Sequence, residues 1–206
     1  MYNLGFGFRY VLMKFKLALI IIFFSFSVHA QKYEEYSPPK LINLNSFGGF
    51  SELGIPMYEL PEGNTYMPLI IGATYNLPLW QAQKKFNIST EFKPQFAYIL
   101  STTGNYEFGL NVMFNFNFQL GQNSYLSYKM SSGPHYINIE TRRQAKGFIF
   151  SDNFFLGYYH HLKLAHQDFV LGGYGGIRHI SNASIKRPNG GINNWMIGIS
   201  LAKLFQ

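Results

Sequence analysis

The amino-acid sequence predicts an all-β protein, an eight-stranded antiparallel outer-membrane β-barrel that follows an N-terminal signal peptide. Three observations lead to this fold class. Long segments alternate between apolar and polar residues, 18% of the residues are aromatic while only 13% are charged, and an apolar N-terminal segment follows basic residues. After residue 30 no apolar run is long enough for a transmembrane helix, so strands must carry the aromatic side chains.

The N-terminal segment has the features of a secretory signal. Two lysines precede the apolar run LALIIIFFSFSV, and residues 28–30 (Val-His-Ala) are typical of a cleavage site. We therefore predict a signal peptide over residues 1–30, with Met13 as an alternative true start, and one β-barrel domain over residues 31–206. An uncleaved membrane anchor is the alternative, but the run is shorter than the ~20 apolar residues that a spanning helix needs.

The amino-acid composition and net charge exclude several classes of function. The chain has no cysteine, which excludes thiol catalysis and a lipid anchor on cysteine. Loss of residues 1–30 lowers the formal net charge from +7 to +4, because Arg9, Lys14 and Lys16 are removed and no acidic residue is. A charge of this size gives no argument for nucleic acid as a partner, and it suits a cell surface with anionic lipid headgroups.

Residues 106–120 are the clearest strand. Their even positions are apolar or aromatic, whereas their odd positions are mostly Asn, Gln, Glu and Gly. This period of two indicates a strand with one lipid-type face and one polar, interior-type face. A soluble barrel of the lipocalin kind is the alternative, but it would need more charge on its outward faces. The same alternation, with Gly-, Asn- and Pro-containing turns between segments, predicts eight strands at residues 48–57, 66–79, 84–100, 106–121, 124–137, 147–162, 167–182 and 193–205.

The seventh predicted strand carries the residues of greatest chemical interest. Its odd positions form an apolar face that continues into His179 and Ser181, which share that face because side chains alternate along a strand. With an even number of strands and periplasmic termini, this strand runs outward and ends near the outer surface. His179 and Ser181 are thus expected on the outer wall, with Asn193 beside them on the last strand. Trp195 and Tyr174 are expected in an interfacial aromatic belt.

Residues 179–193, HISNASIKRPNGGIN, resemble the signature of the PagL-like lipid A 3-O-deacylases, also called acyloxyacyl hydrolases. In that family a His-x-Ser-Asn stretch is followed by a small residue, a short loop with Pro-Asn and Gly, and the last strand. The resemblance implies an eight-stranded barrel in the outer membrane of a Gram-negative bacterium, the fold that the strand pattern predicts separately. It also implies lipopolysaccharide in the outer leaflet as the partner.

The resemblance further implies a serine esterase that removes an ester-linked acyl chain from position 3 of lipid A. Ser181 would be the nucleophile, His179 the general base, and Asn182 a donor to the oxyanion of the tetrahedral intermediate. Neither a metal nor another cofactor is implied. For the basic residues near this motif, ordinary decoration of a surface loop is the alternative to binding lipid A phosphates. The candidates for substrate binding are Arg178, Lys186, Arg187 and Trp195.

The sequence departs from the family at one position. In the family's better-known members a glutamate fourteen residues after the histidine orients the imidazole, and here that residue is Asn193. An asparagine oxygen can hold an imidazole tautomer, but it cannot stabilise the imidazolium by charge. Three outcomes stay open: a modest rate, an acid from another strand in place of the glutamate, or an inactive site.

Another class of function also stays open, a non-catalytic small outer-membrane barrel with a structural, surface-interaction or apolar-solute passage role. Lipid A is preferred over phospholipid as the substrate on the resemblance alone, and the oligomeric state, including a homodimer, is left open. His160, His161 and His166 give only a weak signal for metal binding, because adjacent residues on a strand face opposite ways.

Overall fold

The structure is a computed structural model, and it describes residues 44–205 apart from residues 62, 64, 84 and 102–103. The predicted signal peptide, residues 1–30, lies outside this described part. None of the described residues belongs to a helix that is long and apolar enough to cross a membrane.

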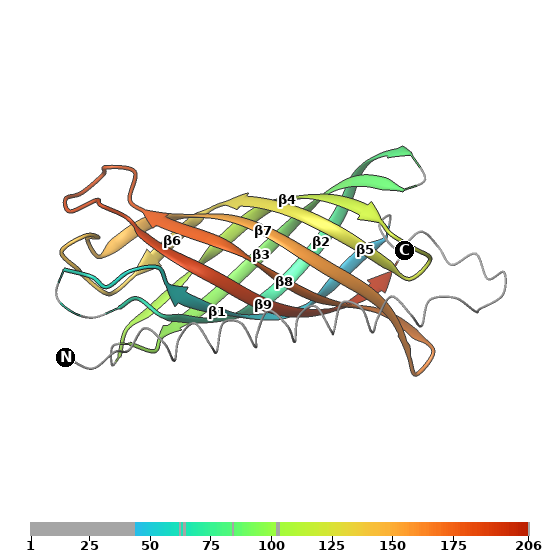
Figure 1. Cartoon of the computed structure of the whole chain (residues 1–206), viewed down its shortest axis with the longest axis horizontal. Coiled ribbons are helices and arrows are strands. Elements are labelled where there is room, and N and C mark those ends of the chain that lie inside the picture. Colours follow the sequence, from blue (N-terminus) through green and yellow to red (C-terminus); the bar gives the residue numbers. More distant parts are fainter. Residues whose placement is uncertain (1–43, 62, 64, 84, 102–103, 206) are drawn as a thin grey trace, which may run out of the picture. The chain divides into compact units, whose positions relative to one another are not determined.

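The described chain forms antiparallel strands that close into a ring (Figure 1). Sequence neighbours pair around the sheet, and β9 pairs with β1. β5 and β6 are two pieces of the predicted fifth strand, because both pair with β4 and β7 and keep one register across Gly133. The described ring therefore has eight strand positions, and the predicted fold class is confirmed. The strands are β1 (Asn45–Pro56), β2 (Pro68–Gln83), β3 (Phe86–Ile99), β4 (Tyr106–Gln119), β5 (Ser124–Ser132), β6 (Pro134–Ile137), β7 (Gly147–Leu164), β8 (Gln167–Ser181) and β9 (Ile192–Phe205).

The outer wall of the barrel is apolar. Side chains alternate between the interior and the wall, as on β8, where Val170 is buried and Leu171 is exposed. Such a wall suits lipid tails, and it reproduces the predicted lipid-type face of residues 106–120. On β4 this face exposes Tyr106, Phe108, Leu110, Phe114 and Phe118.

The two ends of the barrel differ in the length of their connections. Residues 57–67, 138–146 and 182–191 form long connections at one end, on the left in Figure 1. At the other end β7 and β8 are joined by a turn of two residues, Ala165 and His166. Because outer-membrane barrels have short periplasmic turns and longer extracellular loops, the end with the long connections is the extracellular end. β8 therefore runs outward, and its last residues lie at the extracellular rim.

A cluster of charged and polar side chains lies in the interior near the extracellular end. Arg178 is 1% exposed and forms an ion pair with Glu107, and its Nε donates to Ser151 Oγ at 2.9 Å. The same carboxylate contacts His135 and accepts a hydrogen bond of 2.6 Å from the Tyr66 hydroxyl. Burial, followed by the charge of Glu107, raises the pKa of Tyr66 well above its ordinary value, so this tyrosine stays a neutral donor.

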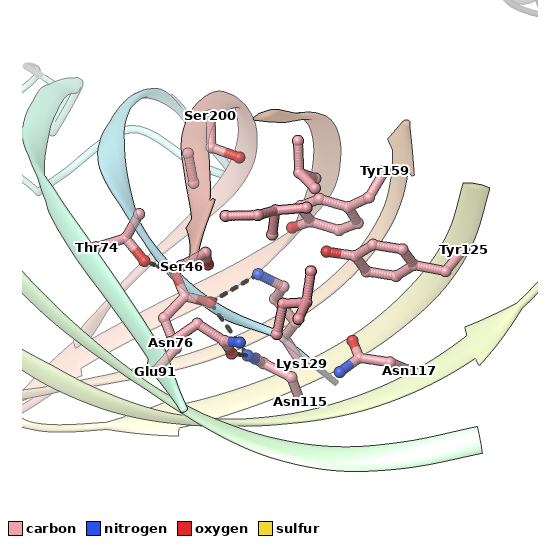
Figure 2. A pocket seen from close by; sticks show the side chains of 14 residues that line it. Ser46, Thr74, Asn76, Glu91, Asn115, Asn117, Tyr125, Lys129, Tyr159 and Ser200 are labelled. Carbon is pink, nitrogen blue, oxygen red and sulfur yellow. Dashed lines mark hydrogen bonds and ion pairs between the residues drawn. The ribbon is translucent and has the colours of Figure 1, made fainter. Parts of the chain in front are cut away.

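A second interior cluster lies toward the other end of the barrel. Lys129 Nζ and Asn115 Nδ2 lie 2.8 Å and 3.1 Å from Glu91 Oε2. Figure 2 shows both side chains pointing at this carboxylate. The predicted belt position of Tyr174 is wrong. This side chain is 9% exposed and donates to Glu52 Oε1 at 2.8 Å, because even-numbered positions of β8 face the interior.

Candidate active site

His179 and Asn193 meet on the outer wall near the extracellular rim. They are register partners on β8 and β9, and His179 Nδ1 lies 2.6 Å from Asn193 Oδ1. Since the amide oxygen can only accept a hydrogen bond, this contact places a proton on Nδ1. The lone pair of Nε2 is then left available to act as a base.

Ser181 shares the outer face of β8 with His179, two residues further along the strand. It is half-buried, and its register partner on β7 is Phe150. Within the described part of the chain, no hydrogen bond joins the Ser181 hydroxyl to His179. Contacts between nucleophile and base are often long in enzymes without substrate and shorten when substrate binds. The structure therefore places a hydroxyl and an oriented imidazole on one face, next to each other along one strand.

Two extracellular connections hold the start of β9 in place. Tyr58 donates to the Gly191 carbonyl at 3.2 Å, and its hydroxyl accepts from the Asn193 backbone N–H at 3.1 Å. Arg143 donates through Nε to the same carbonyl at 3.2 Å and through Nη2 to the Gly190 carbonyl at 2.8 Å. The guanidinium also lies over the Tyr58 ring, 4.6 Å from its centroid. These contacts position the backbone from which the Asn193 side chain extends.

Asn182 follows Ser181 but faces away from it, and it is 2% exposed. Its backbone N–H donates to Asn189 Oδ1 at 2.8 Å, and its Nδ2 donates to the Lys186 carbonyl at 2.7 Å. Both bonds close the loop that follows β8. An oxyanion role for Asn182 would require one of these donors to be released when substrate binds, and this role stays a prediction.

The structure separates the predicted substrate-binding residues into two groups. Arg178 lies inside the barrel in a buried ion pair, so the prediction that it binds phosphates in the outer leaflet is wrong. The cause is again the alternation of faces along β8. Lys186 and Arg187 are exposed in the connection to β9, and Trp195 is 56% exposed on the outer wall. These three lie around the site, and their contact with substrate stays a prediction.

The described residues contain no group of three or more His, Cys, Asp or Glu side chains that could hold a metal ion. His161, one of the three histidines with a weak signal for metal binding, contacts a carboxylate. Its Nε2 lies 2.8 Å from Asp168 Oδ1, toward the turn that joins β7 and β8.

Tyr58, Arg143 and Gly191 were not predicted as parts of the site. The first two lie far from residues 179–193 in sequence, and only closure of the barrel brings their connections together. Gly191 belongs to the Asn-Gly-Gly turn that the sequence does show. With a φ of 64°, it leaves open the space beside the His179 ring. This turn is the one local signal from which such a role could have been found.

The comparisons with known proteins show the family and the fold of the chain. A family model described as "Lipid A 3-O-deacylase (PagL)" matches residues 70–202, which include the three residues at the site. Among solved structures, the chain is similar to the "Crystal structure of the outer membrane enzyme PagL", with a TM-score of 0.57 and 15% identity, over 75% of this chain and 97% of that one. At this identity the likeness shows the fold alone. No curated protein matches the chain.

Family and fold together confirm the predicted location in the outer membrane. The chain belongs to the lipid A 3-O-deacylase (PagL) family.

Proposed function

We propose that this protein is a serine esterase that hydrolyses the ester bond of the acyl chain at position 3 of lipid A. Membership of the family supports this substrate class. The observation that carries the chemistry is the 2.6 Å contact between His179 Nδ1 and Asn193 Oδ1 on the outer wall, beside Ser181. In this proposal Ser181 is the nucleophile, His179 is the general base, and Asn193 holds the imidazole in the reactive tautomer.

The reaction would proceed in two halves. Ser181 Oγ attacks the ester carbonyl carbon while His179 Nε2 takes the hydroxyl proton, and a tetrahedral oxyanion forms. When this intermediate collapses, the bond to the sugar oxygen breaks, and His179 returns the proton to that oxygen. Water then attacks the acyl-serine carbonyl carbon while His179 takes a proton from it, the bond between the acyl carbon and Ser181 Oγ breaks, and His179 returns the proton to Oγ. The products are a free fatty acid and lipid A with a hydroxyl at position 3.

The surroundings of the site suit an amphipathic substrate. Below the rim the wall is apolar, with Ile177 and Trp195 exposed as register partners beneath the polar pair. We place the acyl chain against this wall, where both side chains would otherwise contact membrane lipid. We also propose that Lys186 and Arg187, exposed in the rim loop, bind the lipid A phosphates through charge-assisted hydrogen bonds.

A non-catalytic barrel is the second candidate, and one observation favours it: Asn193 stands where the family's better-known members carry glutamate. A passage role for apolar solutes is the least favoured form of this alternative. The described interior contains buried ion pairs, among them Arg178 with Glu107 and Lys129 with Glu91. Desolvated charges in a lumen oppose the transit of an apolar molecule.

Mass spectrometry of lipid A distinguishes the two candidates. Expression of the full chain in a Gram-negative host is expected to remove one hydroxyacyl chain from lipid A, whereas the same host with an empty vector keeps it. The shift in apparent mass of the unheated protein on a gel would show that the barrel is folded in the outer membrane. Intact lipid A in cells that contain the folded barrel would exclude the esterase and leave the non-catalytic role.

Gly191 provides a prediction about the geometry of the base. A Cβ at this position would lie 2.4 Å from His179 Cε1 and 3.1 Å from Nε2. We expect Gly191→Ala to displace the ring and to lower kcat for deacylation by about 10²-fold, because a shift of about 1 Å in a catalytic group costs this much. The rate is measured with the purified, folded barrel and purified lipid A.

Gly190→Ala is the control for a side chain added to the same turn, at a position without the positive φ of Gly191. Its Cβ would lie 3.4 Å or more from the nearest atoms, all of Arg143, so the neighbouring residues need to shift little. We expect Gly190→Ala to retain most of the activity. Equal losses in the two variants would show that the loop tolerates no side chain in general, and that the space beside His179 is not the cause.

A further inference from the structure

The imidazole of His179 has a second neighbour that the motif does not contain. In the sheet, β8 lies between β7 and β9, so His179 has one register partner on each side. On β9 this partner is Asn193, and on β7 it is Asp152. Side chains directly opposite each other on antiparallel strands have Cβ atoms about 4.5–5.5 Å apart and interact. The residues that flank His179 across the sheet are therefore an asparagine on one side and an aspartate on the other.

The carboxylate of Asp152 faces the outer wall. The residues before and after it, Ser151 and Asn153, are buried in the interior, where Ser151 Oγ accepts from Arg178. On the face of Asp152 the nearest residues along β7 are Phe150 and Phe154, the second of which is exposed. By the alternation of faces, Asp152 thus lies in an apolar stripe of the wall that otherwise suits lipid.

Asp152 is exceptional among the acidic residues of the described strands. Glu52, Glu91 and Glu107 are buried in the interior, and Asp168 shares the interior-facing parity of β8 and bonds to His161. Asp152 is the acid of these strands that faces outward. An ionisable residue on a lipid-facing surface is costly and is rarely kept without a function. Here it lies opposite the histidine of the site.

We propose that Asp152 is a positioning residue that supplies, through His179, the negative charge that Asn193 cannot supply. The two roles that one glutamate fills elsewhere in the family are divided in this chain. Asn193 accepts the Nδ1–H and sets the tautomer, while the Asp152 carboxylate stabilises the imidazolium that forms during the reaction. At a rim that borders lipid, the charge of Asp152 is weakly screened across the distance between adjacent strands. The carboxylate therefore stabilises the imidazolium without a hydrogen bond to the ring. This assignment rests on the proposed function.

The other groups around the ring do not provide this charge. From β9 the ring meets the neutral Asn193, and from the connection before β9 it meets the backbone of Gly191. The carbonyl of Gly191 binds the cationic Arg143, and the exposed Lys186 and Arg187 lie in the same connection. These cations destabilise a positive charge on His179. The imidazolium therefore depends more strongly on the negative charge of Asp152.

The test compares Asp152→Asn with the wild type, both as full-length folded barrels in detergent with purified lipid A as the substrate. The amide keeps the shape of the side chain and removes its charge. We expect kcat to fall by about 10- to 100-fold with little change in KM, because the charge acts on the imidazolium of the transition state. We also expect the acidic limb of the pH profile of kcat to move to lower pH, because a less stabilised imidazolium loses its proton more readily.

Three further variants make the test specific. Asp168→Asn removes the same charge from the opposite end of the same hairpin and should leave kcat unchanged. Asp152→Glu keeps the charge one methylene further out and should retain most of kcat, even if Asp152→Asn folds poorly. Asn193→Glu in the Asp152→Asn background restores a carboxylate from the other side. It should recover kcat and return the acidic limb to higher pH, which a merely structural role of Asp152 would not explain.

The outcomes separate the assignment of Asp152 from the proposed function. An active wild type with an unchanged kcat and pH profile in Asp152→Asn would overturn the assignment and leave the esterase intact. A folded wild type without activity, whose Asn193→Glu variant is also inactive, would overturn the proposed function, and the assignment with it. A loss in Asp152→Asn that Asn193→Glu does not recover would also overturn the assignment.

Discussion

Replacement of Ser181 by alanine is expected to lower deacylation of lipid A by about 10⁶-fold, the loss of kcat found when a serine nucleophile is removed from a catalytic triad. The physical reason is the loss of the covalent route. Without the hydroxyl, water must attack the ester directly, and only binding and oxyanion stabilisation remain. The measurement is the rate of fatty acid release by the purified, folded barrel. Because Ser181 is half-buried and its hydroxyl makes no hydrogen bond with described residues, the variant should unfold at the same denaturant concentration as the wild type.

Ser184→Ala is the matched control for this variant. Ser184 lies three residues further along, exposed in the rim loop, and its hydroxyl accepts a hydrogen bond of 3.2 Å from Asn189. Its loss should leave the rate within about threefold of the wild type, since it removes one exposed hydrogen bond. Similar rates for Ser181→Ala and wild type would exclude Ser181 as the nucleophile, whatever the rate of the control.

Replacement of Arg178 by alanine is expected to destabilise the barrel by about 3–5 kcal/mol, the usual cost of removing one partner of a buried ion pair. Glu107 would remain buried with a negative charge and without its cationic partner, and among the described residues it would keep His135 and Tyr66 as polar contacts. The free energy of unfolding is measured by guanidinium titration of the barrel in detergent or vesicles.

The paired variant Arg178→Met/Glu107→Gln removes both charges and should recover much of this loss, because no isolated charge remains in the interior. Arg187→Ala, which removes an exposed cation from the rim loop, should change the free energy of unfolding by less than about 0.5 kcal/mol. An Arg178→Ala variant as stable as the wild type would show that the interior is hydrated enough to accommodate a free carboxylate.

The sequence predicts most of the fold because alternation and turn residues are local signals. Predicted and observed ends agree closely for residues 106–121 and 167–182, which became β4 and β8. The same signal placed His179 and Ser181 on the outer wall correctly. It would also have placed Arg178 and Tyr174 inside, since both have the opposite parity. Their chemical types, a cation near phosphates and an aromatic near a membrane surface, suggested the outside, and this reasoning was wrong.

The partners across the sheet could not be predicted in the same way. Alternation determines which face a residue occupies, but it leaves the register free to slip in steps of two residues. Asp152 is therefore visible as an outward-facing acid in the sequence, whereas its place opposite His179 depends on the pairing of β7 with β8. The ion pair of Arg178 with Glu107 joins β8 to β4, which are not neighbours in the sheet, and only the closed interior brings them together.

The outward direction of His179 and Asn193 also determines how a substrate arrives. A site at the mouth of a lumen meets molecules from solution, whereas a site on the barrel wall is reached by sideways diffusion within one leaflet. The search for substrate is then two-dimensional, and the concentration that determines the rate is the mole fraction of the substrate lipid in that leaflet. In the proposed reaction the released acyl chain would stay in the same layer. Saturation, product inhibition and turnover should therefore follow the composition and fluidity of the membrane around the barrel.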